Sequence, residues 1–217
     1  MKASFKNITR LIMAVLIFMP LTMLAQQNAE IALFRYSAKG DRVEVRNILE
    51  EGINTNATDK TGKTALMYAA VNDNPAIIDL LVKYGAEVNK TDLSGNTALI
   101  LAAISGSNHA LDVLMEYGGN PEMRVSNGGT ALHAAVVGNN LHCVQTLITN
   151  GVDVNVQNDF GVTPLMHAAV NGNQKMVNLL MEAGAKSSIT NKQGQTAADW
   201  ALQRNHKKIA EQLNSAT

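Results

Sequence analysis

One short pattern recurs along this chain at a fixed spacing of 33 residues. A threonine marks each occurrence, with a glycine two residues before it and an alanine-rich run after it; these are Thr64, Thr97, Thr130, Thr163 and Thr196. A second column, of glycines, keeps the same spacing at Gly52, Gly85, Gly118, Gly151 and Gly184. Such self-similarity is typical of stacked repeats, in which each unit buries its apolar side against its neighbours. The sequence therefore predicts one elongated array.

Each 33-residue unit contains the signals for two helices and a loop. In residues 59–91, Thr64 stands where its hydroxyl can cap a first helix, and Pro75 suits the first turn of a second helix. Gly85 suits the left-handed position that ends a helix. Apolar residues between these signals recur at helical spacing. We therefore expect an all-α fold made of antiparallel helix pairs.

Two segments resemble the Thr-Pro-Leu-His box of the ankyrin repeat family. Thr163-Pro164-Leu165 carries the proline, and Thr130-Ala131-Leu132-His133 carries the histidine. The resemblance implies an ankyrin-repeat solenoid of stacked helix-turn-helix units with projecting β-hairpin-like loops. It covers residues 26–217, with repeats at about 26–58, 59–91, 92–124, 125–157, 158–190 and 191–217. Loop 118–125 departs from the family's loop sequence, and we expect its turn to differ from the others.

The first 25 residues have a different composition. A basic start is followed by the apolar run Leu11–Met19, then Pro20, with Ala25 as a small residue before Gln26. This layout predicts a secretory signal peptide over 1–25 and an exported protein of bacterial type, periplasmic or secreted. The alternative is an uncleaved anchor, but a membrane-spanning helix needs about 20 apolar residues and this run is shorter.

Charge and cysteine content narrow the partners further. Residues 1–25 hold three basic and no acidic residues, which leaves 15 basic and 18 acidic residues in the remainder. That balance argues against nucleic acid, which calls for a basic stripe, and against a membrane partner after signal cleavage. Cys143 is the one cysteine, so no internal disulfide can form. Its position on a second helix predicts a buried apolar role rather than a reactive thiol.

No catalytic motif stands out in the sequence. There is no phosphate loop, zinc-protease helix or nucleophile elbow, so we expect no catalytic residue, no cofactor and no enzyme activity. His133 and His167 lie 34 residues apart on neighbouring first helices and are the one candidate metal pair. No third ligand joins them, so we expect no metal site. The family resemblance implies that His133 instead bonds a loop backbone. Asp59, Asp92 and Asp159 fit local turn chemistry.

The resemblance implies that partners bind the loop tips and the concave face of the first helices. Carried onto this sequence, it gives the partner-binding candidates Lys60, Lys63, Val71, Leu93, Asn96, Ile104, Asn127, Val137, Phe160, Val162, Val170 and Arg204. Val71, Ile104, Val137 and Val170 form an apolar column that either faces a partner or packs onto neighbouring first helices. Phe160 and Leu93 favour partner contact, because a loop tip gives them no core to enter.

The sequence thus predicts a non-enzymatic protein–protein interaction module. Its partner is an unidentified protein, and we expect the chain itself to be a monomer. Two alternatives stay open, a secreted effector that acts in another cell and an accessory or stabilising subunit of a periplasmic enzyme. Asn56, Asn89 and Asn155 occupy one loop column, where we expect them to tie successive loops through backbone hydrogen bonds.

Overall fold

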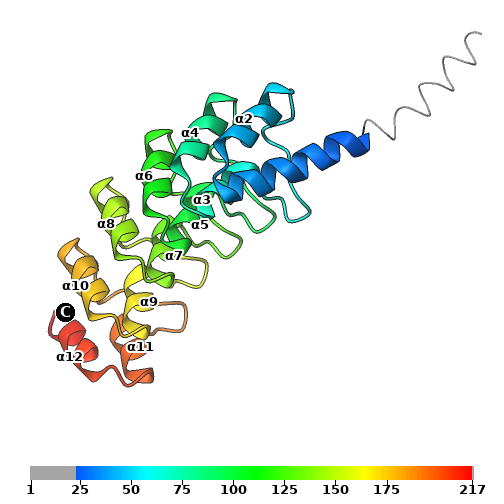
Figure 1. Cartoon of the computed structure of the whole chain (residues 1–217). Helices are drawn as coiled ribbons and strands as arrows, with labels where there is room; N and C mark the ends of the chain where they lie inside the picture. The colour runs from blue at the N-terminus through cyan, green and yellow to red at the C-terminus, as the bar shows by residue number, and fades with distance from the viewer. Residues whose placement is uncertain (1–22, 217) are drawn as a thin grey trace, which may run out of the picture.

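The computed structural model describes residues 23–216, which form a curved stack of helix pairs (Figure 1). Residues 23–39 are helical, and the remaining helices are α2 (Arg42–Glu50), α3 (Ala65–Val71), α4 (Pro75–Lys83), α5 (Ala98–Ser105), α6 (Asn108–Glu116), α7 (Ala131–Val137), α8 (Leu141–Thr149), α9 (Pro164–Val170), α10 (Gln174–Glu182), α11 (Ala197–Gln203) and α12 (Lys207–Ser215). Residues 23–216 contain no strand. The all-α prediction is confirmed, and the projecting loops are turns rather than strands.

The stack has two layers of helices and one row of loops. The second helices α4, α6, α8 and α10 form one row, the first helices α3, α5, α7 and α9 form the next, and the loops project beyond them (Figure 1). Within residues 23–216 no helix has both the length and the apolar character needed to cross a bilayer. Of the predicted signal peptide, residues 1–22 lie outside the described part of the chain.

The recurring threonines cap the first helices, as the sequence predicts. Thr64 Oγ1 accepts a hydrogen bond from the Met67 amide at 3.3 Å, and Thr97 and Thr163 do the same for Ile100 and Met166. The glycine before each cap is needed for a separate reason. Gly62 has a φ of +82°, and a Cβ there would lie 2.8 Å from the backbone nitrogen of Leu93 in the next loop. Only glycine allows both the turn and this close approach.

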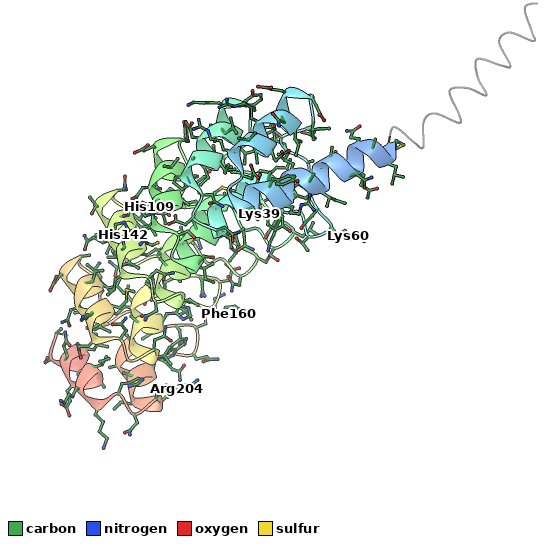
Figure 2. The ribbon with its side chains drawn as sticks, viewed as in Figure 1. Lys39, Lys60, His109, His142, Phe160 and Arg204 are labelled. Carbon is green, nitrogen blue, oxygen red and sulfur yellow. The ribbon has the colours of Figure 1, made fainter. Side chains whose placement is uncertain are left out.

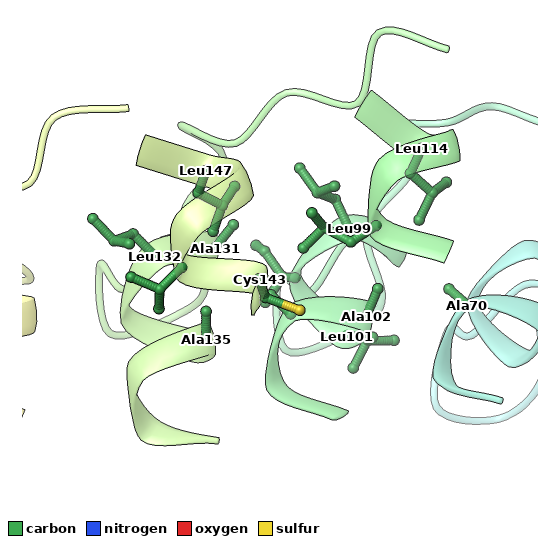
Figure 3. Packing of buried hydrophobic residues seen from close by; sticks show 14 of the residues in the cluster. Ala70, Leu99, Leu101, Ala102, Leu114, Ala131, Leu132, Ala135, Cys143 and Leu147 are labelled. Carbon is green, nitrogen blue, oxygen red and sulfur yellow. The ribbon is translucent and has the colours of Figure 1, made fainter. Parts of the chain in front are cut away.

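Small residues let the two helix layers pack closely. Ala70, Ala102 and Ala135 are fully buried on successive first helices, and Leu114 and Leu147 of the second helices fill the space between them (Figure 3). Cys143 lies in this core with no exposed surface, which confirms its predicted role. Burial raises the pKa of its thiol to about 11, so the thiolate that would react is disfavoured.

The asparagine column joins successive loops. Asn89 Nδ2 donates to the Gly118 carbonyl at 3.0 Å, and its Oδ1 accepts from the Asn120 amide at 2.7 Å. Asn56 and Asn155 make the same pair of bonds to the loops that follow them. These contacts confirm the predicted role of the column.

The prediction of an unusual turn in loop 118–125 is wrong. The Gly119 amide donates to the Leu114 carbonyl at 2.8 Å, as Ala86 and Ala185 do to Leu81 and Leu180 in their own loops. The altered residues keep these backbone bonds because the bonds need only an amide and a positive φ at the preceding glycine, which Gly118 supplies at +78°.

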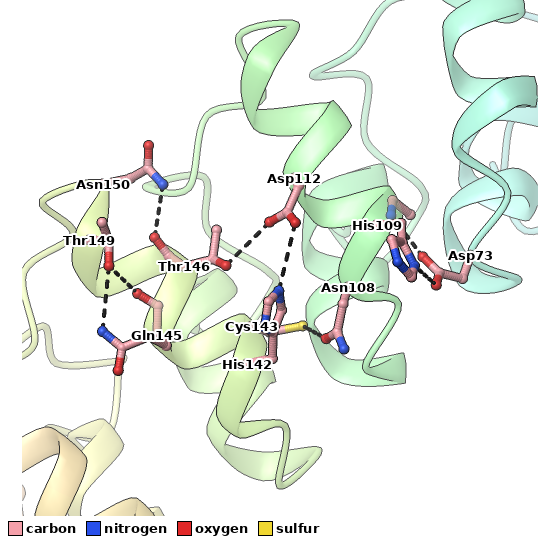
Figure 4. A network of polar contacts seen from close by, with 11 residues as sticks. Asp73, Asn108, His109, Asp112, His142, Cys143, Gln145, Thr146, Thr149 and Asn150 are labelled. Carbon is pink, nitrogen blue, oxygen red and sulfur yellow. Dashed lines mark hydrogen bonds and ion pairs between the residues drawn. The ribbon is translucent and has the colours of Figure 1, made fainter.

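Polar side chains link neighbouring repeats on the side away from the loops. The Asp73 carboxylate lies 2.8 Å from His109 Nδ1 and also accepts from the Ala110 amide (Figure 4). Thr146 Oγ1 donates to Asp112 at 3.2 Å, which joins α8 to α6. Exposed ion pairs and hydrogen bonds of this kind add little stability each, so the buried alanine and leucine layers hold the stack together.

Candidate partner-binding groove

A groove of about 530 Å³ opens between the loops and first helices of the last three repeats. His133 on α7, His167 on α9 and Trp200 on α11 line it from the helix side. Phe160 and Lys192, from two successive loops, line it from the loop side. Its accessible surface is mainly apolar, although several lining residues, such as Asn127 and Gln193, are polar. This combination is typical of a ligand-binding site.

Two small residues create the hollow. Ala134 occupies the position that Tyr68, Leu101, His167 and Trp200 fill in the other repeats. Gly129 likewise stands where the column otherwise has Lys63, Asn96, Val162 and Gln195. Both small residues line the groove. A repeat with short side chains therefore lies between repeats with long ones, and the difference leaves an open space.

Five of the predicted partner-binding residues line this groove, namely Ile104, Asn127, Val137, Phe160 and Val162. Phe160 is 60 % exposed at its loop tip, on the opposite side of the stack from His109 and His142 (Figure 2). Val162 is only 6 % exposed, so it forms part of the floor. In the valine column, Val71, Ile104 and Val137 remain exposed and Val170 is half-buried.

The other predicted residues lie outside this groove. Lys60 lines a second hollow, of about 440 Å³, between the helix of residues 23–39 and the loop that carries Asp59. Leu93 is 79 % exposed at its own loop tip. The rest are Lys63, Val71, Asn96, Val170 and Arg204, none of which lines the groove of the last three repeats. The predicted set therefore spreads along the whole stack, whereas the groove gathers less than half of it.

The second hollow is built on an aromatic pair. The rings of Phe34 and Tyr68 stack with their centroids 5.8 Å apart, and the Tyr68 hydroxyl donates to Asp59 Oδ2 at 2.7 Å. Burial raises the pKa of the Asp59 carboxyl, but hydrogen bonds from Tyr68, Thr61 and Lys63 outweigh it and bring the pKa to about 2. Asp59 is therefore ionised, and its carboxylate accepts the hydrogen bonds of its own turn, as the sequence predicts.

The two histidines of the main groove are held by their surroundings. His133 Nε2 lies 3.0 Å from the Val162 carbonyl oxygen, which can only accept, so this nitrogen carries the proton. The His133 Nδ1 accepts from the Thr130 amide at 3.3 Å. Burial lowers the pKa of His133, and it lowers that of His167 to about 4 with a further contribution from His133. Both rings are therefore neutral near pH 7.

This geometry leaves no free nitrogen on His133 for a metal ion. The rings of His133 and His167 meet edge to face with centroids 6.1 Å apart, and His167 meets Trp200 in the same way at 5.9 Å. Across residues 23–216 no three His, Cys, Asp or Glu side chains gather closely enough to hold a metal. The row acts as an aromatic wall, and the predicted bond from His133 to a loop backbone is confirmed.

Sequence reasoning missed that these rings form one wall of a groove. The spacing of His133 and His167 alone indicates a pair of metal ligands or a hydrogen bond to a loop backbone. The position of Trp200 in the terminal repeat indicates a capping role. A comparison of side-chain size at one equivalent position of the repeats would have revealed the groove. That position holds Tyr68, Leu101, Ala134, His167 and Trp200. A single small member among large ones predicts a hollow beside it.

Comparisons with known proteins agree with the fold. The family model for ankyrin repeats (three copies) matches residues 1–92, 89–158 and 137–216. The solved ankyrin repeat domain of Bcl-3, a member of the IkappaB protein family, is similar at 28 % identity, with a TM-score of 0.76 and 85 % of each chain covered.

A bacterial structure is similar to the same extent. This chain is 32 % identical to an ankyrin repeat domain from Acinetobacter baumannii AYE, with a TM-score of 0.75, over 85 % of this chain and 96 % of that one. No curated protein matches the sequence. The family model covers nearly the whole chain, and the helix pairs, threonine caps and loop bonds repeat with its period. The chain belongs to the ankyrin repeat family.

Proposed function

We propose that this protein is an exported, non-enzymatic module that binds a partner protein through the groove of its last three repeats. Ankyrin repeat domains are generally protein-interaction modules and typically non-catalytic. The observation that carries the proposal is the 60 % exposed Phe160 at the edge of a groove whose accessible surface is mainly apolar. Exposed aromatic side chains beside a pocket are typical anchors of protein interfaces.

The proposal of export rests on residues 1–25 of the sequence. Their basic start, apolar run and small residue at Ala25 are the parts of a cleavable signal. Mass spectrometry of the protein from fractionated host cells tests it. We expect a chain that begins at Gln26 in the exported fraction, and a full-length chain found only in the cytoplasm would contradict export.

Binding is tested by crosslinking and capture from the native host with the wild-type chain and Phe160→Ala. Because Phe160 contributes little to the core, we expect several-fold weaker capture of the partner and a melting temperature within about 2 °C of wild type. Val43→Ala on α2 is the matched control, since Val43 is also an exposed apolar residue, at 68 %, and lies far from the groove.

The outcome separates the possible roles. Equal losses of melting temperature and capture by Phe160→Ala would mean that Phe160 supports the fold rather than the interface. Capture of one periplasmic enzyme in constant ratio would identify an accessory subunit. Capture only from the extract of another cell would identify an effector.

A further inference from the structure

We infer that the groove of the last three repeats takes a short segment of the partner protein in which a bulky apolar side chain stands next to an acidic one. This inference rests on the proposed binding function and names the chemistry of the partner. It is carried by the shape of the groove at Ala134 and by the charges around it. The two arguments come from different residues.

The apolar part of the segment is defined by the hollow over Ala134. The neighbouring members of its column are Leu101 on one side and His167 on the other, and the loop side is closed by Phe160 and Val162. A volume of about 530 Å³ lies in the range of small-ligand pockets, so it has room for one bulky side chain with its flanking backbone. Burial of such a side chain against these walls supplies the main attraction.

The acidic part of the segment is defined by the charges around the groove. Lys192 is the one lining residue with a formal charge at neutral pH, and it is exposed at its loop tip. The charge of Lys192 is positive, so this end of the groove favours a carboxylate over an ammonium group.

Two carboxylates of these repeats, Asp159 and Asp199, lie outside the groove lining. Asp199 Oδ2 accepts from both the amide and the hydroxyl of Thr196 at 2.8 Å, which holds it at the start of α11. The Asp159 carboxylate lies over Gly128 at the loop tip. The positive side chain therefore stands next to the hollow without an opposing charge in the lining.

A neutral polar group completes the site. No described hydrogen bond uses a ring nitrogen of His167, although the ring is mostly buried and lines the groove. A neutral imidazole has one donor and one acceptor, which matches the amide and carbonyl of an extended peptide. His167 is thus placed to bond the backbone of the segment between its apolar and its acidic residue.

Trp200 provides a direct reporter because it is the one tryptophan of the chain and lines the groove. The probes are three acetylated and amidated heptapeptides on a Gly-Ser background, with a central Phe followed by Glu, Gln or Lys. Shifts of the Trp200 indole N–H signal in ¹H–¹⁵N spectra give each dissociation constant. We expect the Phe-Glu peptide to bind two- to fivefold tighter than Phe-Gln, the range of an exposed ion pair, and Phe-Lys to bind weakest.

Two variants locate the effect, the first with a matched control variant and the second with its own amide spectrum as the control. Lys192→Gln should remove the preference for Glu over Gln, whereas Lys60→Gln, in the same loop column but at the other hollow, should keep it. Ala134→Leu should abolish the Trp200 shifts for all three peptides, because it fills the hollow with the side chain found at Leu101. Its remaining amide signals should stay dispersed, since the same residue is accommodated one repeat earlier.

Several outcomes would overturn the inference. They are equal binding of Phe-Lys and Phe-Glu, unchanged binding in Ala134→Leu, or no Trp200 shift with any peptide at millimolar concentration. Tighter binding of a Phe peptide with a free C-terminal carboxylate than of Phe-Glu would overturn the assignment to an acidic side chain. If the host partner is captured equally by wild type and Ala134→Leu, the inference fails while the binding function stands. If nothing is captured at all, the binding function fails.

Discussion

His133 Nε2 of α7 lies 3.0 Å from the carbonyl oxygen of Val162, 29 residues further along the chain in the next repeat. The same carbonyl also accepts from the Asn158 amide at 3.0 Å. One side chain thus fastens a first helix to the loop that follows it, across a repeat boundary. The bond is buried, so it contributes more than an exposed contact would.

The first prediction concerns this bond. His133→Met places the residue found at the equivalent Met67 and Met166, so the volume is kept while both ring hydrogen bonds, to the Val162 carbonyl and from the Thr130 amide, are lost. We expect a loss of about 1 to 3 kcal/mol in the free energy of unfolding, because the buried Thr130 amide loses its partner whereas Val162 keeps its bond from Asn158. Urea denaturation measures it. His142→Ala is the control, since that exposed ring should change stability by less than about 0.5 kcal/mol. Equal stability of His133→Met and wild type would show that the bond contributes nothing.

The second prediction concerns pH and His167. The pKa of its ring is about 4 in the folded protein, whereas an unperturbed histidine has a pKa of 6.5, so the unfolded chain binds the extra proton between these values. The contribution of neutral His167 to the free energy of unfolding is fully present above pH 6.5. It falls by up to about 3 kcal/mol as the pH drops toward 4. We expect His167→Leu, which copies Leu101, to flatten the stability profile between pH 7 and 5. An unchanged slope in this variant would contradict the assignment.

The third prediction concerns a missing member of the asparagine column. Glu122 occupies the column position between Asn89 and Asn155, and no described bond joins its side chain to the next loop. Glu122→Asn should form the bonds to Gly151 and Asp153 that the other members make to their loops. We expect a gain of about 1 kcal/mol, measured by urea denaturation. Glu122→Ala removes the carboxylate without adding bonds and should leave stability close to wild type.

The fourth prediction concerns the threonine caps. Thr97 is fully buried and its hydroxyl accepts from the Ile100 amide at 3.3 Å. Thr97→Ala should lower the free energy of unfolding by about 1 to 2 kcal/mol. Thr97→Ser keeps the hydroxyl and should recover most of that loss. If serine and alanine were equally destabilising, the methyl group rather than the cap would be the important part.

The repeats, caps and loop bonds were predictable because each depends on residues close in sequence. A threonine before a helix, a glycine after one and an asparagine in a loop act within a few residues of themselves or at one fixed step of 33. The turn at Gly118 shows the limit of that approach, because a changed loop sequence kept the backbone bonds of its neighbours.

The groove was harder to predict because it depends on relative size. Ala134 and Gly129 are ordinary residues for a helix and a loop, and nothing in their own repeat marks them. The hollow exists because Leu101, His167 and Trp200 are large at the equivalent position. The charge of Lys192 likewise indicates a binding preference only because the hollow lies beside it. The hollow and its neighbouring charge can be recognised when equivalent positions are compared across the repeats.

Burial of the lone cysteine makes the stack easy to probe. Because Cys143 is sealed between repeats and the chain has no other thiol, a cysteine introduced at any loop tip would be labelled alone by a maleimide dye under native conditions. The unmodified protein offers the complementary measurement. The rate at which Cys143 of the wild-type protein reacts with a thiol reagent would measure how often the packing around α8 opens. This measurement needs no label or substitution.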